Sequence, residues 1–117
     1  MTLPLTPENL RAAYDYLCTT QPYNRWNLPD GEDVVFKVVR DRSLQGWHTF
    51  DGIQHVIGIS GFCIGTSGSL ITVMAHEMVH VHENAIKISR VDVEHSQAFK
   101  RFAARVCQFH GFDPKLF

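Results

Sequence analysis

The residues of this chain with the clearest chemical potential are His76, Glu77 and His80, which form an H-E-x-x-H pattern. In a helix, residues four positions apart differ by about 40° around the axis, so both imidazoles point the same way and can bind one metal ion. Glu77 can reach a water on that ion without replacing it as a ligand. The spacing predicts a hydrolytic zinc site with Glu77 as general base.

A catalytic zinc site takes three protein ligands and leaves one position for water, so a third ligand is needed. His82 lies six residues after His76, about 240° around the helix, and therefore faces elsewhere. The prediction is His95, just before the next expected helix, with Glu94 and Asp92 as alternatives. A carboxylate that is not a ligand can instead accept a hydrogen bond from a ligand imidazole.

These features resemble the SprT-like metallopeptidases, the family that includes the Spartan proteases. The resemblance covers roughly residues 34–112 and rests on the H-E-M-V-H helix, the glycine-rich loop before it, and His95 followed four residues later by Phe99. In that family the third zinc ligand is a histidine that opens the next helix, usually in an H-G-x-x-F context. Here the segment reads H-S-Q-A-F, with serine in place of glycine.

The resemblance implies a minimal zincin domain that binds one Zn²⁺ per chain through His76, His80 and His95 and cleaves a protein or peptide substrate. Manganese or cobalt could also occupy such a site in vitro. No C-x-x-C pair follows His95, so the zinc ribbon that many relatives append is not expected. The DNA-linked role of the Spartan branch is therefore not carried over.

Local signals predict helices at both ends of the chain and around the motif. Thr6 and Pro7 suit an N-cap and a first helical position, and apolar residues then recur at helical spacing as far as Cys18. Two further helices are expected over residues 70–84 and 96–109, the second ending at Gly111.

Three strands are expected between the first helix and the motif. Val34–Arg40 is a β-branched run, while Gly46–Phe50 and Ile53–Ile59 flank an Asp-Gly pair typical of a tight hairpin. We therefore predict a three-stranded antiparallel meander. Together with the helices, it makes an α+β fold.

Length and composition favour one domain spanning residues 1–117. The formal net charge of −1 argues against a general polyanion binder. Cys18, Cys63 and Cys107 form no close pair, which is typical of free thiols in a reducing compartment. The first residues lack the pattern of a signal peptide, and the longest apolar stretch is too short to cross a membrane. A cytoplasmic protein is expected.

Other functions remain open at this stage. The same metal site could belong to an amidase or peptidoglycan hydrolase, or to a non-catalytic module that keeps zinc for structure. Nucleic-acid binding is a weaker possibility, because Lys100, Arg101 and Arg105 share the polar face of the last helix, although a solvated face is the simpler reading. Oligomeric state is not predicted.

Zinc hydrolases often use a second electrophile, and six side chains have a suitable type. Each is individually better explained as a surface or core residue, so none is chosen. They are His48, His55, His82, His110, Tyr14 and Tyr23.

Overall fold

The computed structural model describes residues 5–61, 67–86 and 97–117, and these residues form an α+β fold. Two short 3-10 helices, η1 and η2, connect the first helix to the first strand. The elements in chain order are α1 (Pro7–Cys18), η1 (Tyr23–Arg25), η2 (Gly31–Asp33), β1 (Val34–Val39), β2 (Gly46–Phe50), β3 (His55–Ser60), α2 (Ser67–Ile86) and α3 (Gln97–His110).

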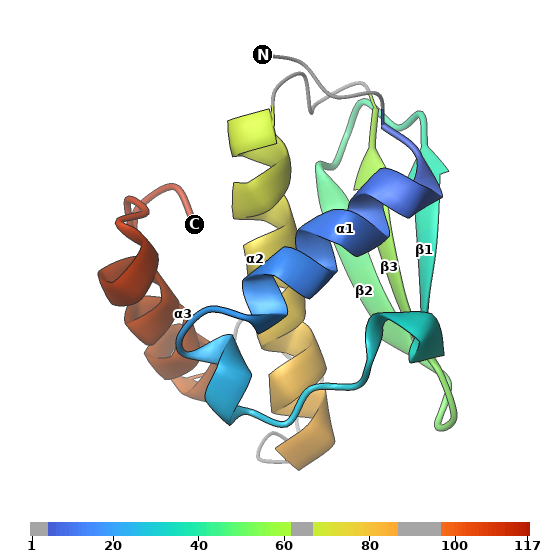
Figure 1. The fold of residues 1–117 in the computed structure, drawn as a ribbon. Helices are drawn as coiled ribbons and strands as arrows, with labels where there is room; N and C mark the ends of the chain where they lie inside the picture. The colour runs from blue at the N-terminus through green and yellow to red at the C-terminus, as the bar shows by residue number, and fades with distance from the viewer. Residues whose placement is uncertain (1–4, 62–66, 87–96) are drawn as a thin grey trace.

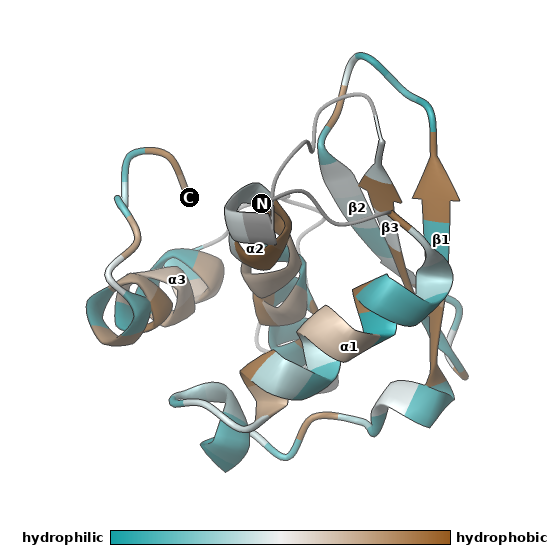
Figure 2. Ribbon diagram, turned by 45° about the horizontal axis from the view of Figure 1, so that its top comes forward, coloured by the Kyte–Doolittle hydropathy of each residue, from teal (hydrophilic) through white to brown (hydrophobic). Residues whose placement is uncertain are grey.

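Helix α2 occupies the middle of the molecule, with the sheet on one side and α3 on the other, while α1 crosses both α2 and the sheet (Figure 1). The hydrophobic colour extends over much of α2 and β1, whereas α1 and α3 are partly hydrophilic (Figure 2). Along α2, Leu70, Met74, Met78, Val79 and Val81 are almost completely buried. The motif therefore lies on the most enclosed helix of the described fold.

The predicted helix ends are largely confirmed. The Thr6 side chain accepts a hydrogen bond from the Asn9 backbone N–H at 3.1 Å and caps α1. At the end of α3, Gly111 adopts a φ of +77°, and its N–H donates to the Cys107 carbonyl at 2.8 Å. Helix α2 extends beyond the predicted 70–84 at both ends. No helix in the described ranges is long and apolar enough to cross a membrane.

The sheet differs from the predicted antiparallel meander. Its order is β1-β3-β2, in which β3 pairs parallel with β1 and antiparallel with β2. The hairpin between β2 and β3 is confirmed, but the expected antiparallel pairing of β1 with β2 is wrong. The sheet is therefore mixed, with β3 in the centre.

The apolar character of β3 explains this order. Ile57 and Ile59 are fully buried, and a central position pairs the backbone of this strand on both sides. The chain between β1 and β2 passes over the end of β3, where the Ser60 N–H donates to the Gln45 carbonyl at 2.8 Å. The N–H of Gly61 likewise donates to the Val39 carbonyl at 2.8 Å. These bonds fix the crossover.

The turn between β2 and β3 is also longer than the predicted two residues. The Asp51 side chain accepts hydrogen bonds from the backbone N–H groups of Ile53 and Gln54, at 2.8 and 2.7 Å. Gly52 has a φ of +97°, which glycine adopts without steric cost. Ile53 is 92% exposed and precedes the strand, so β3 begins at His55 rather than at Ile53.

Candidate metal centre

Helix α2 places the two motif histidines side by side. The centroids of the His76 and His80 rings lie 5.3 Å apart, with their planes at 66°. Phe99 of α3 supports both rings, at centroid distances of 5.0 Å from His76 and 4.3 Å from His80. Phe99 therefore packs against the histidine pair.

The orientation of His76 is set by the end of the described chain. Its Nδ1 lies 2.8 Å from the backbone oxygen of Phe117, and the two rings are 5.4 Å apart. Because this oxygen can only accept a hydrogen bond, the proton of a neutral imidazole belongs on Nδ1. The lone pair is then on Nε2, the nitrogen that a metal would bind.

His80 has an acidic neighbour on its own helix. The Nδ1 atom lies 3.8 Å from Glu83 Oε1, and the two side chains are only 15% and 12% exposed. The distance is too long for a hydrogen bond, but a nearby carboxylate favours a proton on Nδ1. His76 thus has the hydrogen bond at Nδ1 that directs Nε2 of a ligand histidine toward a metal, and His80 has a carboxylate oxygen near the same atom.

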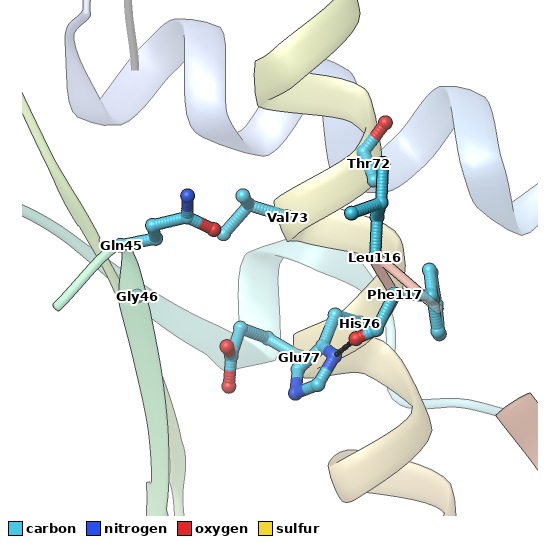
Figure 3. A pocket seen from close by; sticks show the side chains of 8 residues that line it. All are labelled: Gln45, Gly46, Thr72, Val73, His76, Glu77, Leu116 and Phe117. Atoms are coloured by element: carbon cyan, nitrogen blue, oxygen red, sulfur yellow. Dashed lines mark hydrogen bonds between the residues drawn. The ribbon is translucent and has the colours of Figure 1, made fainter. Parts of the chain in front are cut away.

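Glu77 points into a cavity of about 180 Å³ between α2 and β2. Figure 3 shows its carboxylate directed toward the β2 side, next to the His76 ring. Glu77 is only 5% exposed, and the cavity has room for a few water molecules at about 30 Å³ each. The cavity is lined by Gln45, Gly46, Thr72, Val73, His76, Glu77, Leu116 and Phe117.

A glycine allows β2 to approach α2 closely at this cavity. A Cβ atom built on Gly46 would lie 2.9 Å from Cγ1 of Val73 and 2.9 Å from the Gly58 carbonyl oxygen. Any side chain at this position would therefore push the strand and the helix apart. The absence of one keeps the start of β2 next to Glu77.

Two other histidines lie near His80. The rings of His48 and His80 are parallel, with centroids 6.3 Å apart, and His48 Nε2 lies 2.8 Å from His55 Nδ1. Burial, and then the neighbouring His55, lowers the pKa of His48 from 6.5 to about 4. Burial also lowers the pKa of His55. These two neutral imidazoles are the possible second electrophiles that the structure brings toward the motif.

The remaining candidates for a second electrophile have structural partners elsewhere. The Tyr14 hydroxyl donates to the Pro29 carbonyl at 2.5 Å, and the Tyr23 hydroxyl donates to the Ala75 carbonyl at 2.6 Å. His110 Nε2 lies 3.0 Å from Thr20 Oγ1. These contacts join α1 and the following loop to the rest of the core.

His82 faces away from the motif, as its spacing predicts. Its ring stacks on Trp26 with centroids 4.1 Å apart and planes at 8°, and Phe102 meets its edge at 4.7 Å. Phe102 therefore packs behind α2 and not beneath the His76–His80 pair. Within the described part of the chain, the buried Nδ1 of His82 has no hydrogen-bond partner.

The predicted third ligand, His95, lies outside the described residues, as do its alternatives Glu94 and Asp92. Over residues 5–61, 67–86 and 97–117, one group of three potential ligands converges within 4.8 Å. It consists of Asp30, Glu32 and Asp33, which are all exposed and lie around η2. Exposed carboxylates of this kind are common without a metal.

The basic residues considered for nucleic-acid binding are exposed on α3. Lys100, Arg101 and Arg105 all face solvent, and the Arg105 guanidinium lies 5.6 Å from the centroid of the Phe109 ring. Phe99, which contacts the motif histidines, is buried, whereas these three side chains are exposed. This arrangement fits the predicted solvated helix face.

Sequence reasoning missed two groups beside the histidines. Glu83 follows His80 by three residues, a spacing that places it on the same helix face and could have identified it. Phe117 is 41 residues from His76 and acts through its backbone oxygen, so residue type carries no signal for it.

No protein-family model matches the chain, and no curated protein matches it. The geometry of the site therefore carries the functional argument.

Proposed function

We propose that this chain is a zinc-dependent endopeptidase of the SprT-like type, with Glu77 as general base and His76, His80 and His95 as metal ligands. One observation carries the proposal. The buried carboxylate of Glu77 and the ring of His76 line the same small cavity, and the Nδ1 of His76 is hydrogen-bonded to the backbone oxygen of Phe117. A general base beside an oriented metal ligand is what metal-assisted hydrolysis requires.

The donor set fits zinc. Imidazole nitrogens suit this ion, and the environments of His76 and His80 favour a lone pair on each Nε2. Two ligands from one helix leave the third to another segment, and His95, Glu94 and Asp92 remain the candidates for it. When bound, zinc supplies Lewis acidity and lowers the pKa of water to about 7.

The residues of the chain then have distinct tasks. Glu77 accepts a proton from the attacking water and delivers it to the leaving amine nitrogen. Its burial excludes bulk water from the carboxylate, which strengthens its interaction with the reacting groups. His48, as a neutral imidazole near His80, can donate a hydrogen bond to a substrate carbonyl.

The position of β2 supports a peptide substrate over other amides. In the described sheet, β2 is an edge strand, and its first residue, Gly46, lines the cavity that contains Glu77. The outer edge of such a strand can pair with an extended peptide through backbone hydrogen bonds. A peptide aligned in this way would pass beside Glu77.

The same proposal places the enzyme in the cytoplasm. Cys18 is half-buried and Cys107 is buried, and both are free thiols in the structure. Free cysteines are typical of reducing compartments.

The test combines metal content with hydrolysis. Mass spectrometry of the wild-type protein should find one zinc per chain, and His95→Ala should lose it whereas Glu94→Ala retains it. Glu77→Gln should keep the zinc but cleave a mixed peptide library about 10²–10⁴-fold more slowly. Unchanged cleavage by Glu77→Gln would refute the general-base role of Glu77. A protein that takes up no zinc after reconstitution would refute the proposal that it is a zinc enzyme.

The alternatives can be tested with the same samples. Cleavage of peptidoglycan fragments but not of peptides would identify an amidase. Zinc that is bound without any hydrolysis, and is equally tight in Glu77→Gln, would indicate a structural metal.

A further inference from the structure

The end of the described chain forms one wall of the candidate metal centre. After α3, the Asp113 carbonyl accepts hydrogen bonds from the N–H groups of Leu116 and Phe117, at 3.0 and 3.1 Å. The Asp113 side chain accepts a third from the Lys115 N–H at 2.9 Å. The Phe117 ring stacks on Phe112 with centroids 5.6 Å apart. Residues 113–117, called here the C-terminal turn, therefore have a defined shape.

This turn places one backbone atom against the first motif histidine. The Phe117 oxygen lies 2.8 Å from His76 Nδ1, while the Phe117 ring packs 5.4 Å from the His76 ring. In Figure 3 the other ring nitrogen of His76 points toward the side on which the Glu77 carboxylate lies. The contact therefore determines both which nitrogen carries the proton and where the second nitrogen points.

We propose that Phe117 is a positioning residue for His76, whose backbone oxygen holds this imidazole in its Nδ1–H tautomer and thereby sets its affinity for a metal. The metal part of this inference rests on the proposed function, but the tautomer part does not. A ligand histidine free to rotate or to protonate Nε2 would have to reorganise before binding. The hydrogen bond from Nδ1 removes that requirement.

His76 and His80 differ in how far along the chain the neighbour of their Nδ1 atom lies. The acidic neighbour of His80, Glu83, lies one turn along the same helix, so this contact persists wherever α2 is folded. His76 depends on a segment 41 residues away, which must fold against α2 before the oxygen is in place. Any event that displaces the C-terminal turn should weaken the site at His76 and leave His80 intact.

The first measurement is the tautomer of His76 in the metal-free protein, by long-range ¹H–¹⁵N correlation NMR, with His76→Gln used to assign the signal. The wild-type protein should show protonated Nδ1. A variant that ends at Lys115 should change to a mixture or to protonated Nε2. Protonated Nε2 in the wild type, or no change on truncation, would overturn the proposal.

The second measurement is the zinc dissociation constant, by competition with a chromophoric chelator. Removal of residues 116–117 should weaken binding by about 10–100-fold, the usual effect of losing a hydrogen-bond partner of a ligand histidine. Lys115→Ala is the matched control, because the Lys115 side chain is exposed, does not line the cavity, and its loss leaves the Phe117 oxygen in place. Equal affinities of the truncated and wild-type proteins would refute the inference.

Phe117→Ala separates the ring from the oxygen. If the oxygen is the effective group, this variant should keep the Nδ1–H tautomer and lose much less affinity than the truncation. An identical loss in both would show that the ring, not the oxygen, orients His76. If the truncated protein fails to fold, the wild-type tautomer and Phe117→Ala still decide the question.

The outcomes distinguish this inference from the proposed function. A chain that binds no zinc but shows the Nδ1–H tautomer, lost on truncation, would refute the zinc enzyme and support the positioning contact. A chain that binds zinc with the same affinity in both forms would support the metal site and refute the role of Phe117.

Discussion

The two sides of α2 use histidine in opposite ways. On one side, His76 and His80 have an oxygen beside Nδ1 and face a cavity or a neighbouring imidazole pair. On the other, His82 stacks on Trp26 and meets Phe102 edge-on, and among the described residues its Nδ1 has no hydrogen-bond partner. Burial alone does not separate them, since all three side chains are largely enclosed. The difference lies in whether the protein orients a lone pair or packs a flat ring.

The side of α2 that carries His82 supports the side that carries His76 and His80. Trp26 and Phe102 pack on His82, and Tyr23 packs on Trp26. The Tyr23 hydroxyl donates a hydrogen bond to the carbonyl of Ala75, one residue before His76. Because α2 is a rigid element, contacts behind it hold the helix against β2 and α3. Removal of side chains that pack on His82 should therefore lower the free energy of unfolding, whereas removal of His76 or His80 should weaken metal binding.

The largest contrast is expected between His80 and His82. His80→Ala should weaken zinc binding by on the order of 10³-fold or more, because a metal ligand is lost. His82→Phe should leave zinc binding unchanged, because it keeps an aromatic ring against Trp26 on the side of α2 that faces away from the motif. Mass spectrometry and chelator competition measure both. Equal zinc loss in the two variants would remove the proposed distinction between the two sides.

Trp26→Ala tests the supporting side directly. Loss of a large ring that packs on His82, Tyr23 and Phe102 should cost about 3 kcal/mol in the free energy of unfolding. Urea unfolding of the metal-free protein measures this cost. Zinc affinity of the folded fraction should change little, and a large change would mean that the two sides are coupled.

The pH dependence of stability should arise in part from His48, which lies near His80. His48 has a pKa near 4 in the folded protein and near 6.5 when unfolded. Above pH 6.5 both states are neutral at this residue. As the pH falls toward 4, the unfolded chain takes up a proton that the folded chain does not. The free energy of unfolding should therefore fall by up to roughly 3 kcal/mol across this window.

Denaturant titrations of the metal-free protein between pH 7 and pH 4 measure this slope. His48→Gln should flatten it, because the variant has no proton to bind at that position. A slope that is unchanged in His48→Gln would assign the effect to other histidines, such as His55, His82 and His110, whose pKa values are also lowered by burial.

The smallest expected effect concerns the Tyr23 hydroxyl. Tyr23→Phe removes a buried hydrogen bond to the Ala75 carbonyl and should cost about 1–2 kcal/mol in the free energy of unfolding. Thermal unfolding followed by circular dichroism measures the change. Because Ala75 adjoins His76, a simultaneous loss of zinc affinity would show that this bond helps to position the motif.

Some expectations from sequence concern contacts within a few residues, and these were accurate. The Thr6 cap, the Gly111 stop and the β2–β3 hairpin depend on hydrogen bonds between near neighbours. The prediction of an antiparallel meander was wrong because the order of strands in the sheet depends on which strand is buried most completely, not on the order of the strands in the chain. Even the hairpin turn differs in length, since the Asp51 side chain organises four residues.

Helical periodicity alone predicts that His76, Glu77 and His80 lie within about one turn of a helix and that His82 faces away, because the helical repeat sets these angles wherever the helix forms. The central position of β3 and the contact between the Phe117 oxygen and His76 Nδ1 follow only from the folded arrangement of the chain. These contacts join segments far apart in the chain and depend on burial and on backbone atoms. Backbone atoms are the same in every residue, so residue types and spacing carry no record of where they meet.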